Sequence, residues 1–185
     1  MRLLGSLALT LLATAGFAQE KTVGDLFRAV EPSDLITAFV GTCVQSPGRL
    51  DKVGAFAEAM DYATTPEPYW TMFAPQSASA SYHSWMVAEG QGAPYTLGIS
   101  EAPLRDELYQ ICVVSNPFMN ADDALRELKE LVTLSKKIAD DETAGNRIQV
   151  WMTPSILEGS FISLTDIRAM GVDGMTLSIA APKQY

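Results

Sequence analysis

Few side chains in this sequence are suited to catalysis. Its single histidine, His83, would need either a thiolate such as Cys43 as a nucleophilic partner or further ligands around a zinc ion. Cys43, however, is in phase with Phe39 and Val40 on one apolar stripe, and burial there would raise the pKa of its thiol. We therefore interpret His83 as a residue on a strand surface, and we predict no metal site and no cofactor.

Common catalytic and ligand-binding motifs are missing from the sequence. It contains no nucleophile elbow, phosphate-binding loop, dinucleotide fingerprint, zinc-protease helix, CxxC pair or EF-hand loop. Gly90 and Gly92 are not followed by a helix, so they indicate a hairpin turn instead of a phosphate cradle. Asp140, Asp141 and Glu142 stand side by side without a matching second cluster, which is typical of a solvated loop.

The tryptophans suggest a binding surface instead. Alternation along residues 147–153 gives an apolar face and a face that carries an arginine, a glutamine and a tryptophan. If this second face and the histidine-bearing face of an earlier strand both lie away from the helices, they form an aromatic and polar patch. The predicted patch consists of His83, Trp85, Arg147, Gln149 and Trp151. The alternative is that the segment 63–80 covers Trp85 or Trp151.

The two cysteines, Cys43 and Cys112, predict one disulfide if the chain enters an oxidising compartment. Closing the long loop between them would stabilise the fold by about 4 kcal/mol, less any strain in the native state. Two buried free thiols are the alternative.

Residues 1–18 have the features of a secretory signal peptide. Arg2 gives a short positive start, an uncharged apolar run follows, and small residues precede the predicted cleavage site between Ala18 and Gln19. The apolar run is too short to cross a bilayer as a helix, and no cysteine stands at the junction to take a lipid. We therefore expect a soluble chain in the periplasm or outside the cell, with no membrane insertion after processing.

The charge balance narrows the range of partners. The 185 residues include 13 Lys plus Arg against 22 Asp plus Glu, which gives a formal net charge of −9. Because nucleic-acid binding requires clustered basic residues, and anionic lipids repel an acidic protein, we expect neither partner. The length fits one domain, which we place at residues 33–185 after a lead-in at 19–32.

Hydrophobic spacing predicts an α+β domain. One helix starts after the Ser33-Asp34 cap, a second runs from about residue 49 to 62, and a third starts at Asn120 and continues to residue 138. Strands are expected at 82–89, 95–100, 108–115, 147–153, 160–165 and 175–180. The resulting order is two helices, a three-stranded antiparallel meander, one helix and a second three-stranded meander, with the helices packed on one face of the sheet.

This order hints at an internal duplication. Residues 95–99 and 175–179 are also alike in sequence. They would be the second strand of one meander and the third strand of the other, so we interpret their likeness as coincidence.

Several short segments resemble a group of small exported bacterial proteins that carry paired cysteines. The segments are Cys43-Val44-Gln45, Ser84-Trp85, Leu97-Gly98, Cys112-Val113-Val114 and Val150-Trp151-Met152-Thr153-Pro154. The resemblance spans roughly residues 35 to 180. It implies export and a cysteine pair, and it implies no activity and no catalytic residue.

Two functional hypotheses follow from these observations. The first is an exported domain that binds a cell-envelope protein or a small ligand without catalysis; a structural protein of the envelope is not separable from it by sequence. The second is a periplasmic hydrolase with a non-standard site built from Ser, Asp and His83. A deep pocket in which His83 and a carboxylate converge would favour the hydrolase, whereas a flat patch would favour binding.

Overall fold

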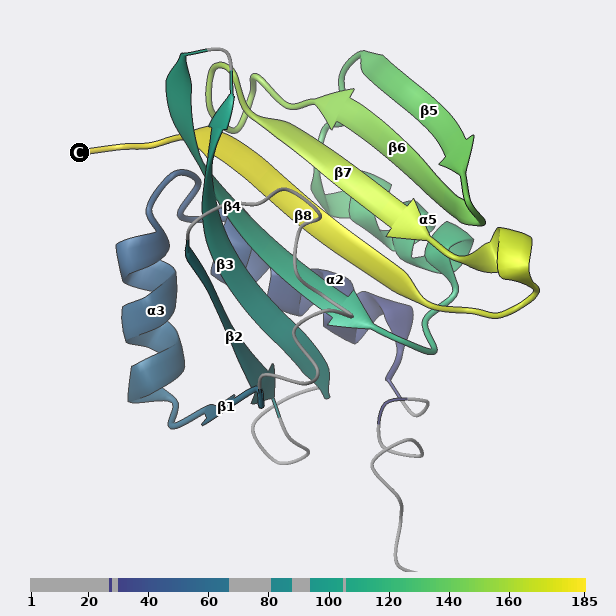
Figure 1. The fold of residues 1–185 in the computed structure, drawn as a ribbon, viewed down its shortest axis with the longest axis horizontal. Coiled ribbons are helices and arrows are strands. Elements are labelled where there is room, and N and C mark those ends of the chain that lie inside the picture. Colours follow the sequence, from purple (N-terminus) through teal and green to yellow (C-terminus); the bar gives the residue numbers. More distant parts are fainter. Residues whose placement is uncertain (1–26, 28–29, 67–80, 88–93, 105) are drawn as a thin grey trace, which may run out of the picture.

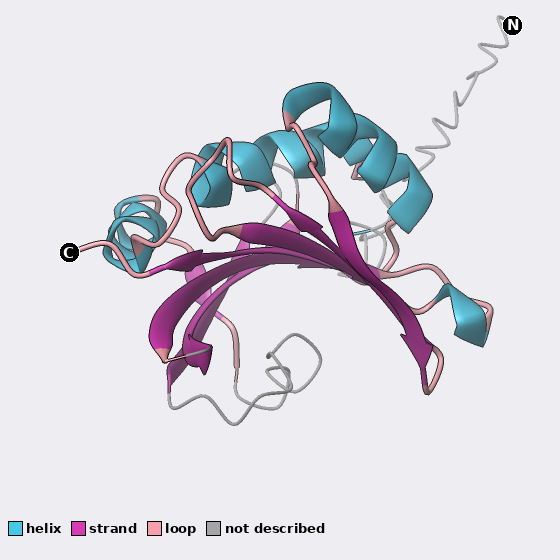
Figure 2. Cartoon of the chain, turned by 90° about the horizontal axis from the view of Figure 1, so that it is seen from above, coloured by secondary structure: helices cyan, strands magenta, loops and turns pink. Residues whose placement is uncertain are grey.

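A computed structural model describes residues 27, 30–66, 81–87, 94–104 and 106–185. Within these residues the strands form one antiparallel sheet of eight strands, in the order β1-β2-β3-β4-β8-β7-β6-β5. The helices all cover the same face of this curved sheet, as Figure 2 shows. The signal-peptide region, most of the lead-in, most of the 63–80 segment and the glycine turn at 90–92 lie outside the described residues.

The sheet is assembled from two successive sets of four strands (Figure 1). The first set is β1 Ala63–Thr64, β2 Ser81–Val87, β3 Tyr95–Leu104 and β4 Glu107–Asn116. The second set is β5 Lys137–Thr143, β6 Asn146–Met152, β7 Phe161–Asp166 and β8 Met175–Pro182. The two sets join at the centre of the sheet, where β4 pairs with β8.

Three helices and two single turns accompany the strands in the described part of the chain. They are α2 Pro32–Phe39, the π-helical turn η1 Val40–Val44, α3 Leu50–Ala59, α5 Ala121–Leu131 and the 3₁₀ turn η3 Arg168–Met170. The Asn120 side chain caps α5 by accepting hydrogen bonds from the backbone N–H groups of Asp122 and Asp123, as the sequence predicted. None of the helices in this part of the chain is long and apolar enough to span a bilayer.

The prediction of two three-stranded meanders is wrong, because each set contains a fourth strand and the two sets share one sheet. Strand β1 is only two residues long, so it has no alternation to recognise. Strand β5 falls where the sequence predicted the last turn of a helix followed by an acidic loop. The backbone leaves the helical region at Val132, and Ile138 is half exposed on the strand instead of buried on a helix.

The strand pairing of the two sets follows a two-fold relation about the β4–β8 pair. Aligned neighbours across the first set are Thr64, Trp85, Leu97 and Val114. Aligned neighbours across the second set are Lys137, Trp151, Ile162 and Ile179. In this relation Val114 on β4 is equivalent to Ile179 on β8, and Cys112 is equivalent to Leu177. The pair Val114–Leu177 therefore corresponds to the pair Ile179–Cys112, and the two rows are equivalent.

The strand pairing also bears on the likeness between residues 95–99 and 175–179. Strand β3 corresponds to β7, where Leu97-Gly98-Ile99-Ser100-Glu101 matches Ile162-Ser163-Leu164-Thr165-Asp166. The pair of segments that looked alike in the sequence, 95–99 and 175–179, are not equivalent strands. This mismatch agrees with the interpretation of their likeness as coincidence.

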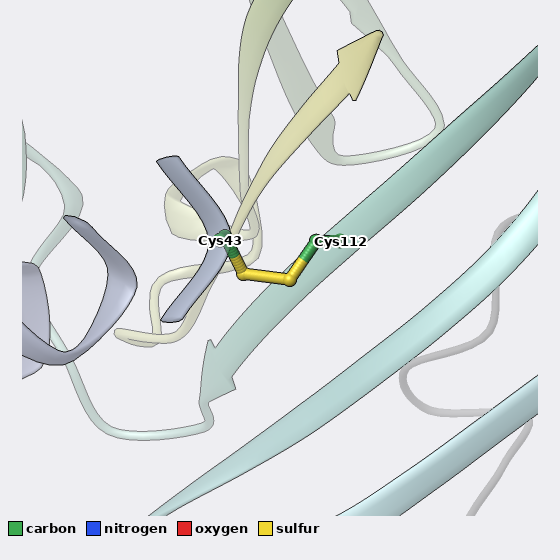
Figure 3. The surroundings of a disulfide bond; sticks show 2 residues. All are labelled: Cys43 and Cys112. Carbon is green, nitrogen blue, oxygen red and sulfur yellow. A yellow bond between two sulfur atoms is a disulfide. The ribbon is translucent and has the colours of Figure 1, made fainter. Parts of the chain in front are cut away.

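The hydrophobic core lies between the sheet and the helices. Its fully buried side chains come from both, among them Leu35, Ile36 and Phe39 on α2 and Leu97 and Leu177 on the sheet. A disulfide joins Cys43 on η1 to Cys112 on β4, with an S–S distance of 2.03 Å and Cα atoms 5.4 Å apart (Figure 3). The predicted bridge is confirmed, and it fastens the helical layer to a central strand.

Candidate functional site

Two neighbouring pockets lie between α3 and strands β2 and β3, and His83 lines both of them. We call them together the α3–β2 groove. The larger, about 490 Å³, is the Arg49 pocket at the start of α3, and the smaller, about 360 Å³, is the Trp85 pocket at its end. His83 is exposed on β2 and stands where the two pockets meet.

A hydrogen-bonded chain of side chains forms the floor of the Arg49 pocket. The backbone N–H of Leu50, in the first turn of α3, donates to Gln110 Oε1 over 2.8 Å. Gln110 Nε2 in turn donates to Glu101 Oε1, and Lys183 Nζ donates to the same oxygen over 3.0 Å. These bonds, first that from Gln110 and then that from Lys183, lower the pKa of Glu101 below its ordinary value. Glu101 is therefore ionised at neutral pH and acts as an acceptor.

The charges at the mouth of the Arg49 pocket are balanced. Arg49 donates two hydrogen bonds to Asp51, from Nε to Oδ1 over 2.9 Å and from Nη2 to Oδ2 over 2.8 Å. The bonds raise the pKa of Arg49 and lower that of Asp51. With Lys183 held by Glu101, both long cations of this pocket already have a carboxylate partner.

The approach of the chain to α3 depends on Gly48. Its φ of 68° lies in the left-handed region, and an added Cβ would meet the Pro182 carbonyl oxygen at 2.2 Å. The Gly48 carbonyl accepts a hydrogen bond from the Gln184 backbone N–H over 2.9 Å. This close contact brings the residues after β8, including Lys183, against the start of α3, where they form a wall of the Arg49 pocket.

The Trp85 pocket has a different character. Glu58 comes from the last turn of α3, and Asp61 follows with a φ of 53°, a left-handed conformation that aspartate tolerates better than most residues. Tyr62, Thr64 and Trp85 complete the lining together with His83 and the neighbouring Ser84. No lysine or arginine is among these described lining residues, so the pocket combines two carboxylates with two aromatic rings.

The structure splits the five residues of the predicted patch into two groups, and only His83 and Trp85 line the groove. Arg147, Gln149 and Trp151 are on β6, which four intervening strands separate from β2. Aligned neighbours on adjacent strands point to the same side of a sheet. By this pairing all five residues lie on the same face as Cys112, which is the face that the helices cover. The predicted common patch away from the helices is therefore wrong.

The other three residues of that patch, Arg147, Gln149 and Trp151, belong to a cluster whose polar groups bind one another. Trp151 is 5% exposed and Gln149 is 4% exposed, so neither is available as a surface anchor. Asp140 on β5 accepts hydrogen bonds from Arg147 Nε at 2.8 Å, Lys137 Nζ at 2.7 Å and Gln149 Nε2 at 3.2 Å. Arg147, and next Lys137, hold the pKa of Asp140 far below its ordinary range. Lys137 Nζ also lies 5.3 Å from the centroid of the Trp151 ring.

The alternation in the sequence identified residues that share a strand face, but not which face the helices cover. The apolar residues of β6, such as Ile148 at 41% exposure, turned out to face away from the helices. Gln110, Glu58 and Asp61 were missed altogether. They join the groove through the packing of α3 on β3 and β4, which leaves no local signal in the sequence.

His83 makes no hydrogen bond to a carboxylate or hydroxyl group in the part of the chain that the structure describes. The same residues include no group of three or more His, Cys, Asp or Glu side chains placed to hold a metal ion. The chemistry available in the groove is thus hydrogen bonding, charge and aromatic contact.

Comparisons of the chain with known protein families, with curated proteins and with solved structures find no match. The residues of the groove are therefore the basis for assigning a function.

Proposed function

We propose that this chain is an exported binding protein without catalytic activity, and that the α3–β2 groove is its ligand site. The observation that carries the proposal is the meeting of two pockets at the exposed His83, each lined by charged and aromatic side chains. Pockets that combine apolar walls with a few convergent polar groups are the usual sites of ligand binding.

Export is supported by two independent features. Residues 1–18 have the pattern of a signal peptide, and the structure contains the Cys43–Cys112 disulfide. Disulfides persist in oxidising compartments and are rare in the reducing cytosol, so both features favour the periplasm or the exterior of the cell.

In the Arg49 pocket, binding is favoured over hydrolysis by the state of Glu101. A general acid–base pair requires His83 and a carboxylate within hydrogen-bond reach of each other or of a shared substrate proton. Glu101 instead accepts hydrogen bonds from Gln110 and Lys183, which lower its pKa and keep it ionised. In this environment Glu101 is suited to accept hydrogen bonds that orient a ligand and, through Gln110, to hold the start of α3 in place.

The proposal can be tested by NMR with small fragments. The oxidised mature chain, labelled with ¹⁵N, would be titrated with four fragments of similar size: butyrate, butylamine, butyramide and benzyl alcohol. We expect at least one of them to shift the His83 amide and Trp85 indole signals while leaving the indole signal of buried Trp151 in place. The Trp85→Phe variant assigns the indole signal.

Two variants make this test specific. His83→Ala alters the point where both pockets meet, so it should weaken binding of the active fragment. Ile148→Ala changes an exposed side chain on the opposite face of the sheet and should leave binding unchanged. The proposal fails if no fragment perturbs the groove at millimolar concentrations, or if all perturbed signals lie elsewhere.

A further inference from the structure

The two-fold relation of the sheet makes Trp85 and Trp151 equivalent residues. Trp85 pairs with Thr64 on the outermost strand β1 and with Leu97 on β3. Trp151 pairs in the same way with Lys137 on the outermost strand β5 and with Ile162 on β7. Both stand on the helix-covered face. The surroundings of one tryptophan can therefore be compared with those of the other, position by position.

In the second set of strands, the tryptophan already holds a cation. Lys137 on the outermost strand is the aligned neighbour of Trp151, and its ammonium group lies 5.3 Å from the ring centroid. The same ammonium donates to the Asp140 carboxylate over 2.7 Å. A cation between an aromatic face and a carboxylate is attracted both by the ring quadrupole and by the opposite charge.

In the first set, the position equivalent to Lys137 is Thr64, which pairs with Trp85. Threonine is shorter and uncharged, and at this place the structure has the 360 Å³ Trp85 pocket, lined by both residues. A carboxylate is present here too, but it comes from the last turn of α3, as Glu58. The first set thus has the ring and an acidic group, without a lysine among the described lining residues.

We propose that the Trp85 pocket binds a primary alkylammonium group, in the place that the Lys137 side chain takes in the second set. This inference rests on the proposed function and specifies the chemistry of its ligand. The group could be a lysine side chain of a partner peptide or a free amine, since both present the same ammonium on an alkyl chain. The C-terminal end of α3 adds partial negative charge at the pocket, and the net charge of −9 attracts cations to the protein.

The probes are two matched pairs that differ only in the charge. N-acetyl-lysine methylamide is compared with N-acetyl-norleucine methylamide, and a short peptide with a central lysine is compared with its norleucine counterpart. Titrations at low ionic strength follow the Trp85 indole signal, with the Trp151 indole signal as the internal reference. We expect saturable shifts from the ammonium members only, and tighter binding of the peptide would identify a peptide as the source of the group.

Substitutions in the pocket give the sharper test. Trp85→Leu should abolish the shifts of neighbouring signals, and Glu58→Gln should weaken binding about two- to fivefold, as expected for one partly exposed charge pair. Thr64→Lys should place an internal ammonium over Trp85, in imitation of Lys137, and should block the external ligand. Thr64→Met, of similar length but uncharged, is its control and should block less.

Three outcomes would overturn the inference: equal binding of the norleucine probes, unchanged binding in Thr64→Lys, or shifts confined to signals outside the pocket. Its failure is distinguishable from failure of the proposed function. If butyrate or butyramide perturbs the groove and no amine does, the ammonium site is refuted while the groove stands as a ligand site. If no fragment perturbs the groove, both are refuted. A circular dichroism spectrum of each variant confirms that it has folded.

Discussion

At the scale of single residues, Glu101 has a role that its position in the sequence does not indicate. It receives hydrogen bonds from Gln110 on the neighbouring strand and from Lys183 after the last strand, so one carboxylate ties three parts of the chain together. Through Gln110 this connection extends to the first backbone N–H of α3. The shape of the Arg49 pocket therefore depends on the Glu101 carboxylate, which Gln110 and Lys183 hold in position.

This arrangement predicts a pH-dependent loss in Glu101→Gln. The folded-state pKa of Glu101 is lowered from its ordinary value of 4.5, so its contribution to stability is present above that pH and is lost as the pH falls through the lowered folded pKa. At pH 7 the variant should be about 1 kcal/mol less stable, because it loses the charged part of two hydrogen bonds. Urea unfolding at pH 7, 5 and 3 would show the difference shrinking at the lowest pH; a constant difference would contradict the assignment.

The two equivalent tryptophans should respond differently to truncation. Trp151 is 5% exposed, so Trp151→Ala should cost about 3–5 kcal/mol of unfolding free energy. Trp85 is only partly buried, so Trp85→Ala should cost clearly less. Thermal melts of both variants check this. A small loss for Trp151→Ala would restore the idea that the β6 face is an exposed anchor.

At the scale of elements, the sequence predicted what is encoded locally. The start of α5 was predicted because Asn120 and the two aspartates after it form a cap that needs no distant partner. Its end was missed, because Ile138 continues the helical spacing by chance while the backbone has already become extended at Val132. Pairing with β6 decided the conformation of this segment, as often happens when tertiary contacts override local preference.

The link between η1 and β4 should be the strongest single constraint on the helical layer. Removing the bridge in Cys112→Ser should cost about 4 kcal/mol or less in the chain-entropy model, since the disulfide closes a 69-residue separation. The measurement is a pair of melts, with and without reductant. Wild-type protein should lose stability on reduction while Cys112→Ser should not change, and an unchanged wild type would contradict a role for the bridge.

At the scale of the whole molecule, the unpredicted feature is the joining of the two halves. The pairing of β4 with β8 connects residues such as Val113 and Ser178 that are far apart along the chain, and no local pattern specifies it.

The groove likewise has no local pattern that specifies it. His83 and Trp85 were recognised from their strand, but their pocket partners Glu58 and Asp61 depend on how α3 packs. The disulfide was predictable because a chain with two cysteines allows only one intramolecular pair.

Processing is a property of the whole chain and can be measured directly. If residues 1–18 are a signal peptide, mass spectrometry of the protein recovered from the periplasm or the medium should find a chain that starts at Gln19. The Cys43–Cys112 bridge should be intact in that material by non-reducing peptide mapping. Recovery of the full-length chain from the membrane fraction would contradict export by this route.

The two outer strands have a consequence for solubility at high concentration. An open sheet ends in unpaired backbone groups, which can recruit the edge of another molecule and start aggregation. One end of this sheet is the two-residue β1, too short to be a good template. The other end is β5, whose exposed side chains include Lys137, Asp141 and Glu142. The charged side chains of this edge strand thus keep neighbouring copies apart.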